Sequence, residues 1–118
     1  MTEYQHQLTL IKWTQQPSIR KRYPELRLLF HIANERKDKK ETIILKRVGV
    51  KSGVPDLFLP VSRSGFHGLW IELKTETGKT SDVQDWWIDN LRLEGYCVEV
   101  CKGWQQATEL LERYLNGL

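Results

Sequence analysis

The sequence has 118 residues, a net charge of +3, 40% hydrophobic residues and 28% charged residues. This length provides for one hydrophobic core, so we expect a single domain over residues 1–118. The composition is that of a folded globular protein rather than a disordered chain. No apolar run approaches the roughly 20 residues that a membrane-spanning helix needs.

Charge is unevenly distributed along the chain. Residues 12–55 hold 12 Lys or Arg and 4 Asp or Glu, whereas the remaining residues hold 6 basic and 11 acidic side chains. A basic region of this kind suits a polyanion such as nucleic acid. The plainer interpretation, a solvated charged surface, stays open at this point.

Targeting and redox signals point to a reducing compartment. The N-terminal stretch MTEYQHQL is polar and shows no signal-peptide pattern. Cys97 and Cys101 lie four residues apart in an extended segment, about 13 Å, which is too far for a disulfide between them. With no histidine nearby they also make a poor zinc site.

The first half of the chain predicts a helix, a strand and a short helical piece. Tyr4, Leu8 and Ile11 recur at helical spacing and predict a helix over residues 3–14, ended by Pro17. The apolar run ELRLLFHIAN predicts a strand over residues 25–34. We expect ERKDKK to form a charged loop and ETIILKRVG a short helix or turn.

The second half predicts two strands, a helix, a strand and a final amphipathic helix. The strands are expected at residues 56–61, 69–74 and 96–101, with a glycine-containing connection at residues 62–68. A helix over residues 81–95 begins with cap residues and ends at Gly95. The last helix carries the stripe Trp104, Ala107, Leu111 and Tyr114. This order predicts an α/β fold with a central mixed β-sheet flanked by helices.

In the helix predicted to end at Gly95, the neighbouring side chains of Trp86 and Trp87 cannot both be buried. Val83, Trp87 and Leu91 make the expected core stripe of residues 81–95, so Trp86 is the better candidate for an exposed or interface position. In the same helix SDVQ predicts a capping box, with Ser81 at the N-cap and Gln84 at the third helical position.

Polar side chains are expected to cluster on one face of a hairpin. Glu72 and Lys74 are two residues apart on a strand and share a face. An antiparallel hairpin centred near Gly65 would place residue 56 opposite 74 and residue 58 opposite 72, bringing Asp56 to the same cluster. A one-residue slip would send Asp56 to the other face. The alternatives are ordinary turn chemistry for the Pro-Asp pair and a solvated face for Glu-Leu-Lys.

Such a cluster has a chemical use. Two converging carboxylates repel each other unless a cation lies between them. Hard oxygen ligands favour Mg²⁺ or Mn²⁺, and a lysine can orient or deprotonate a water or stabilise charge on a phosphate. Together these groups suit phosphodiester hydrolysis.

These motifs, taken together, resemble those of known nucleases. GVPDLFL, followed after 16 residues by IELK, resembles the PD-(D/E)xK nuclease superfamily with its restriction-endonuclease-like core. The run KRVGVKSGVPDLFLPVSRSGFHGLWIELKTETGKTSDVQDWW and the later GYCVEVCKGWQQA resemble the VRR-NUC family of virus-type replication-repair nucleases. The similarity covers about residues 28–115.

The resemblance implies roles for individual residues. Asp56 and Glu72 match the metal-binding acids, Lys74 the catalytic lysine and Gln84 the motif glutamine. It further implies Glu3 as an acid on the first helix that binds the metal, Leu73 as a carbonyl ligand, and Lys46 and Arg47 as contacts to nucleic acid. Two further candidate contacts to nucleic acid are Lys51 and, in the glycine-containing connection, His67. HIANE matches a family segment containing Asn34, with alanine at position 33 where the family leads us to expect proline.

The resemblance implies a Mg²⁺- or Mn²⁺-dependent endodeoxyribonuclease, selective for DNA structure and similar to Holliday-junction resolvases. It implies a homodimer acting on branched DNA in DNA repair, in the cytoplasm of a bacterium or a phage-infected host cell. Two rival hypotheses are a non-catalytic DNA-binding module with the nuclease fold and a structural α/β domain with a charged rim. Metal binding and turnover discriminate between the three.

Overall fold

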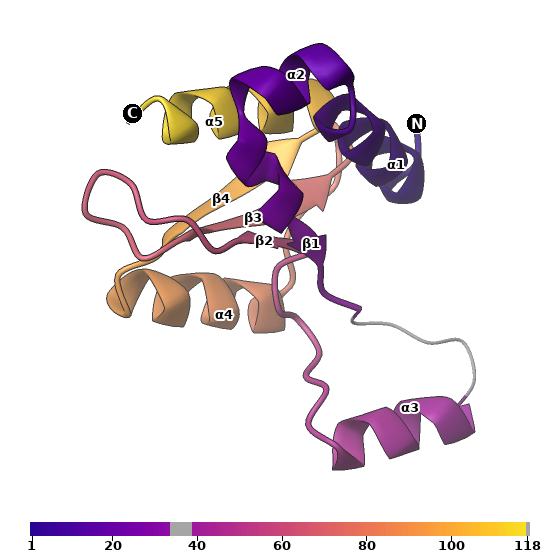
Figure 1. The fold of residues 1–118 in the computed structure, drawn as a ribbon. Helices are drawn as coiled ribbons and strands as arrows, with labels where there is room; N and C mark the ends of the chain where they lie inside the picture. The colour runs from indigo at the N-terminus through magenta and orange to yellow at the C-terminus, as the bar shows by residue number, and fades with distance from the viewer. Residues whose placement is uncertain (34–38, 118) are drawn as a thin grey trace.

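The computed structural model describes residues 1–33 and 39–117 (Figure 1). Ten helices and strands follow one another within these residues. In chain order they are α1 (Glu3–Thr14), α2 (Pro17–Arg22), the 3₁₀ helix η1 (Pro24–Leu28), β1 (Phe30–His31), α3 (Lys39–Arg47), β2 (Leu57–Leu59), β3 (Leu69–Lys74), α4 (Asp82–Leu93), β4 (Cys97–Lys102) and α5 (Trp104–Leu115).

The four strands form one mixed sheet in the order β1-β2-β3-β4. The pairs β1–β2 and β2–β3 are antiparallel, and β3–β4 is parallel because the chain crosses over through α4. Helices α1, α2 and α5 lie on one side of the sheet and α4 on the other, while α3 projects away from the body (Figure 1). The predicted α/β fold with a mixed sheet flanked by helices is confirmed.

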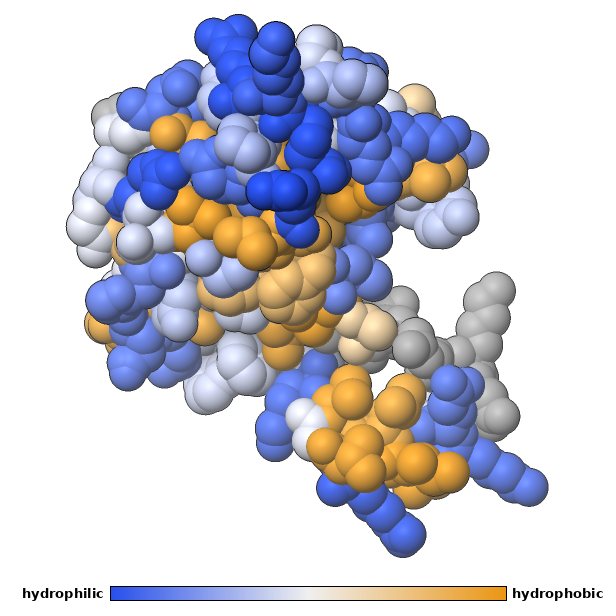
Figure 2. All heavy atoms as spheres, in the orientation of Figure 1, coloured by the Kyte–Doolittle hydropathy of each residue, from blue (hydrophilic) through white to orange (hydrophobic). Residues whose placement is uncertain are grey.

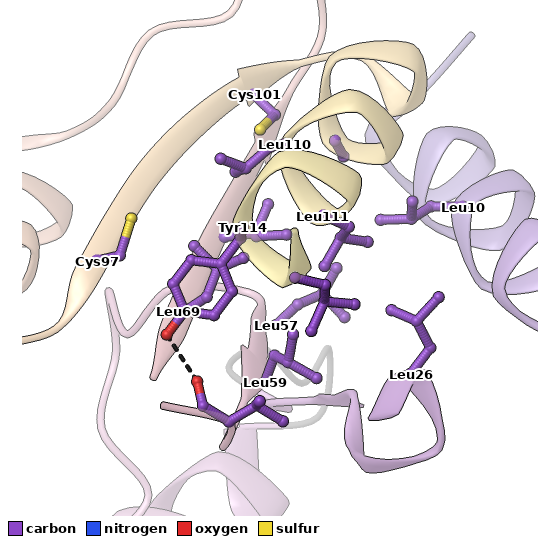
Figure 3. Close-up of a cluster of buried hydrophobic side chains, with 14 of the residues drawn as sticks. Leu10, Leu26, Leu57, Leu59, Leu69, Cys97, Cys101, Leu110, Leu111 and Tyr114 are labelled. Carbon is purple, nitrogen blue, oxygen red and sulfur yellow. Dashed lines mark hydrogen bonds between the residues drawn. The ribbon is translucent and has the colours of Figure 1, made fainter. Parts of the chain in front are cut away.

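The hydrophobic core lies between the sheet and the layer of α1 and α5. Alternate residues of a strand point to one face, and the odd-numbered residues of β2 and β3 are apolar. Five of them are at most 1% exposed, and they pack with Leu10 of α1 and Leu111 and Tyr114 of α5 (Figure 3). The even-numbered positions of β3 are thereby left for Glu72 and Lys74 on the opposite face.

Tyr114 connects α5 to the chain after β2 through a buried hydrogen bond. Its hydroxyl donates to the main-chain carbonyl of Val61 at 2.6 Å (Figure 3). We expect Tyr114→Phe to lower the free energy of unfolding by about 1 kcal/mol, since the carbonyl loses its partner inside the core. Urea unfolding measures the change. Tyr4→Phe is the matched control because Tyr4 is 74% exposed, and equal losses in both variants would contradict the assignment.

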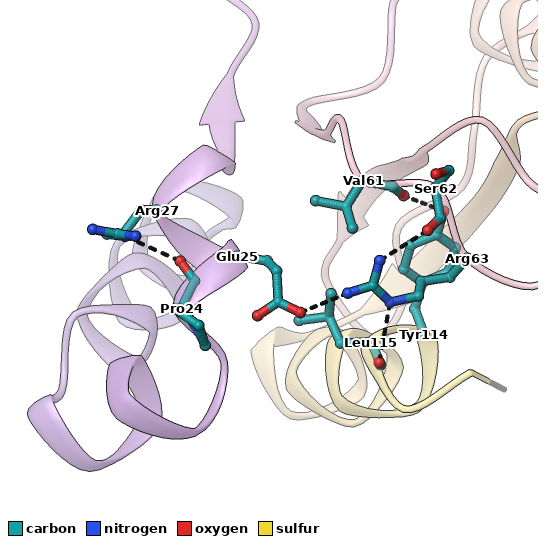
Figure 4. A network of polar contacts seen from close by, with 8 residues as sticks. All are labelled: Pro24, Glu25, Arg27, Val61, Ser62, Arg63, Tyr114 and Leu115. Atoms are coloured by element: carbon teal, nitrogen blue, oxygen red, sulfur yellow. Dashed lines mark hydrogen bonds and ion pairs between the residues drawn. The ribbon is translucent and has the colours of Figure 1, made fainter.

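Arg63 holds the far end of the β2–β3 hairpin against two helices. Its guanidinium donates to Glu25 of η1 at 2.6 Å and to the carbonyl of Leu115 at 3.4 Å (Figure 4). A third bond joins it to the adjacent carbonyl of Ser62 at 2.9 Å. This network fixes the hairpin at the end remote from Asp56.

Two sequence-based predictions for the N-terminal half are wrong. In place of the long strand expected at 25–34, the described residues form η1 and the two-residue strand β1, and Pro24 at the start of η1 favours a helical turn there. Pro17 begins α2, which was not predicted. In α1 the buried residues are Leu10 and Thr14, whereas Tyr4 and Leu8 are exposed.

The remaining elements follow the prediction closely. The strand expected at 56–61 is shortened to β2, and the short helix expected near residues 41–49 is α3. Asn34 and most of the predicted charged loop lie outside the described residues. Within the described part of the chain, no helix is long and apolar enough to cross a membrane.

Candidate active site

Asp56, Glu72 and Lys74 meet at one end of the sheet. In the antiparallel β2–β3 pair, Leu57 lies opposite Ile71. Extending this register by one residue places Asp56 opposite Glu72. The predicted hairpin therefore forms, but its register is shifted by two residues, because the turn is centred at residue 64 rather than at Gly65. An even shift preserves which face each side chain occupies. The three polar residues thus share a face, as the sequence indicated.

The backbone holds Asp56 in place on both sides. Its Oδ2 accepts a hydrogen bond from the main-chain N–H of Leu73 at 2.8 Å. Its own carbonyl accepts from the N–H of Ile32 at 2.8 Å and lies 2.9 Å from Nδ1 of His31. These bonds join β1, β2 and β3 at a single residue.

Gly53 shapes the approach to Asp56. Its φ is +86°, a conformation that favours glycine, and a Cβ there would lie 2.9 Å from a methyl group of Val83. Just before it, the indole N–H of Trp87 donates to the carbonyl of Ser52 at 3.1 Å. The glycine in the sequence GVPD is therefore required by close packing of the connection on α4.

Glu72 and Lys74 form a buried ion pair. Lys74 Nζ lies 3.4 Å from Glu72 Oε2, and the two residues are 7% and 1% exposed. Burial, with the negative charge of Asp56 as the second cause, raises the pKa of Glu72 to about 8. Burial also raises the pKa of Asp56 above its ordinary value, although the Leu73 N–H opposes this.

Gln84 combines the two roles that the sequence left open. Ser81 and Gln84 form the predicted capping box at the start of α4, with bonds of 2.9 and 3.3 Å. The side-chain NH₂ of Gln84 also donates to Glu72 Oε2 at 3.2 Å. The cap therefore positions the amide against the acid cluster, and the catalytic role of Gln84 stays a prediction.

A cleft of about 590 Å³ opens above these side chains. The N-terminal turns of α1 form one wall and contribute Glu3, so the helix and the β2–β3 pair face each other across it. Sequence reasoning missed several further residues in the lining, among them four with polar side chains near the N-terminus and β1. They are Thr2, Tyr4, Gln7 and His31. Only the spacing of Glu3 and Gln7, one helical turn apart, signalled part of this set.

The acids suit a hard divalent cation. Mg²⁺ commonly binds proteins through one or two carboxylates and keeps waters or phosphate oxygens as its other ligands. Asp56 and Glu72 meet that requirement, and a cation would offset the burial and the repulsion from Asp56 that together raise the pKa of Glu72. However, among the described residues no three His, Cys, Asp or Glu side chains are grouped to hold a metal. Glu3 therefore lines the cleft without joining the pair in the expected trio.

The predicted nucleic-acid contacts occupy two separate places. Lys46 and Arg47 lie in the last turn of α3, and Lys51 follows in the connection that leads back to Asp56. His67 lies next to β3 at its start, whereas Lys74 ends that strand. The His67 ring contacts Tyr96, and the main-chain N–H of His67 donates to the carbonyl of Gly95. The structure thus places His67 at the end of the hairpin remote from the cleft.

Comparison with known proteins assigns the family. The VRR-NUC domain matches residues 1–105. A solved structure described as a VRR_NUC domain protein is similar to this chain with a TM-score of 0.84 and 30% identity, over 99% of this chain and 90% of that one. Among curated proteins no match was found. The chain therefore belongs to the VRR-NUC domain family, a nuclease-type family of DNA-processing proteins.

Proposed function

We propose that this protein is a metal-dependent endonuclease that hydrolyses phosphodiester bonds in DNA. The cluster of half-buried Asp56 with the buried Glu72 and Lys74, at the floor of an open cleft, carries this proposal. Holding two acids together in a site that disfavours their ionisation costs stability, and perturbed acids of this kind concentrate at functional sites. Membership of a nuclease family points to the same chemistry.

The residues of the cleft have different roles in this proposal. Asp56 and Glu72 would hold Mg²⁺ or Mn²⁺, with the carbonyl of Leu73 as a further ligand. Glu3 lines the cleft from α1 but is not grouped with the two acids, so we propose that it joins the metal ligands only when the cation is bound. A cation held there would supply Lewis-acid polarisation of a phosphoryl oxygen. Lys74 orients the attacking water and stabilises negative charge that develops on the phosphate. Gln84 keeps the Glu72 carboxylate oriented through its hydrogen bond.

We further propose a structure-selective enzyme that acts as a homodimer on branched DNA, in the manner of Holliday-junction resolvases. Among the described residues, Asp56, Glu72 and Lys74 form a single cluster in one copy, and the cut of two strands needs two such clusters related by symmetry. The basic side chains at the end of α3 would contact the DNA backbone, which carries no sequence information. In-line attack by water leaves a 5′-phosphate and a 3′-hydroxyl.

Metal-dependent cleavage tests the proposal directly. We expect purified protein with Mn²⁺ or Mg²⁺ to cut a labelled four-way junction, and EDTA to abolish the cut. Flap and linear duplex substrates of the same sequence measure the structural preference. Salt-dependent binding without cleavage of any substrate would instead identify a DNA-binding module. Equal cleavage of junction and linear duplex would remove the structural selectivity while leaving the nuclease in place.

A further inference from the structure

Helix α3 carries an apolar face that is open to solvent. None of its nine residues is buried. Ile43 is 54% exposed, Ile44 61%, and Val48, directly after the helix, 74%. Figure 2 shows hydrophobic side chains gathered on this projecting helix with hydrophilic ones at its edges.

A helix of this length needs a packing partner. Isolated helices shorter than about 12 to 15 residues are only marginally stable in water, because nucleation is costly and most helical stability in proteins comes from packing an apolar face. Exposed apolar patches on soluble proteins mark interaction sites. The side chains Ile43, Ile44 and Val48 are therefore expected to be covered by another surface.

The outer face of α4 is complementary to α3. Asp82, Trp86, Asp89 and Leu93 follow one another at helical spacing on the side away from the sheet. Trp86 is 57% exposed and Leu93 83%. The face therefore combines apolar side chains with carboxylates, whereas α3 combines its apolar side chains with Lys39, Lys40, Lys46 and Arg47 against the single acid Glu41.

The chain holds α3 away from its own α4. The connection after α3 is fixed at Ser52, which accepts the indole hydrogen bond of Trp87, and at Gly53, which packs against Val83. This anchor lies at the first turns of α4, and α3 projects beyond it (Figure 1). The outer face of α4 is consequently left open in the same molecule.

We propose that α3 of one copy docks on the outer face of α4 of a second copy, and reciprocally. This inference rests on the dimer proposed above and assigns its interface. A two-fold arrangement uses the α3–α4 contact twice, which doubles the buried area without a second kind of surface. An α3–α3 contact would instead bring two basic helices together, with Lys46 and Arg47 of each copy facing like charges.

The mass in solution tests the interface. Wild type is expected at twice 14.0 kDa by light scattering coupled to gel filtration. Ile44→Asp on α3 and Trp86→Asp on α4 are each expected to raise the dimer dissociation constant at least about 10-fold, since each buries a charge in the contact. Leu28→Asp is the matched control, because Leu28 is 52% exposed and lies on η1.

Mixing the two variants identifies the partner surface. The mixture retains one intact contact, between α3 of the Trp86→Asp copy and α4 of the Ile44→Asp copy. We expect heterodimers at concentrations where each variant alone is monomeric. Wild type that is monomeric throughout, a dimer lost only in Ile44→Asp, or a mixture that stays monomeric would overturn the interface.

The mass in solution does not depend on catalysis, so the experiments can contradict the proposed interface and the proposed nuclease activity independently. A monomer that cuts DNA would contradict only the interface. A dimer with this mutational pattern that cuts no DNA would contradict only the nuclease. Circular dichroism spectra identical to wild type show that the three variants fold.

Discussion

Lys74→Ala is expected to lower the rate of DNA cleavage by at least about 10²-fold while leaving DNA binding unchanged. Lys74 is 7% exposed and lies beside the two acids at the floor of the cleft. An interaction with charge that develops only during the reaction affects the rate constant more than the affinity. Single-turnover cleavage with Mn²⁺ and a filter-binding titration measure the two quantities separately.

Lys102→Ala is the matched control for this variant. Lys102 pairs with Lys74 in the parallel β3–β4 ladder, so it lies at the same level of the neighbouring strand. Its side chain is exposed and does not line the cleft. Cleavage by Lys102→Ala should match wild type. Unchanged cleavage by Lys74→Ala, or an equal loss in both variants, would contradict the catalytic role of Lys74.

The sequence predicted the cluster on the floor of the site because strand alternation is a local property. Glu72 and Lys74 share a face in any strand, and the parity of a hairpin decides on which face Asp56 lies. The predicted register was wrong by two residues. An even shift leaves every side chain on the predicted face of the sheet, so the predicted cluster still forms. The capping box at Ser81 and Gln84 was equally local and is confirmed.

The walls of the cleft could not be predicted in the same way. Tyr4 and Gln7 reach the site because α1 packs across the sheet, which depends on Leu10 meeting the buried face of β3 and α5. The exposure of Tyr4 contradicts its apolar spacing, since the helix is oriented by its packing and not by its hydrophobic pattern alone. Val83 is likewise exposed on a helix whose stripe predicted it as core, while the exposure of Trp86 was anticipated.

Glu72→Gln is expected to abolish metal-dependent cleavage and, at the same time, to stabilise the metal-free protein at pH 8. The folded protein raises the pKa of Glu72 from 4.5 to about 8, whereas the unfolded chain keeps the ordinary value. Between these two values the folded state binds more protons than the unfolded state. Stability contributed by Glu72 is therefore lost as the pH rises from about 4.5 to 8.

Glutamine keeps the shape of the side chain and removes the charge, so the stability of Glu72→Gln should not fall over this pH range. Wild type and Glu72→Gln should unfold at similar temperatures in EDTA at pH 5. At pH 8 the variant should be more stable by roughly 1 to 2 kcal/mol, after allowance for screening by water in the open cleft. Calorimetric titration with Mn²⁺ should detect binding only in wild type.

The opposite stability change would assign Glu72 a structural role. A carboxylate retained for its ion pair with Lys74 would make the variant less stable at every pH, because the buried ammonium would lose its partner. A carboxylate that serves to bind a cation destabilises the metal-free protein, and bound metal removes this destabilisation. Thermal unfolding of both proteins across pH 5 to 8, with and without Mn²⁺, therefore separates a site that binds metal from an ion pair that supports the fold.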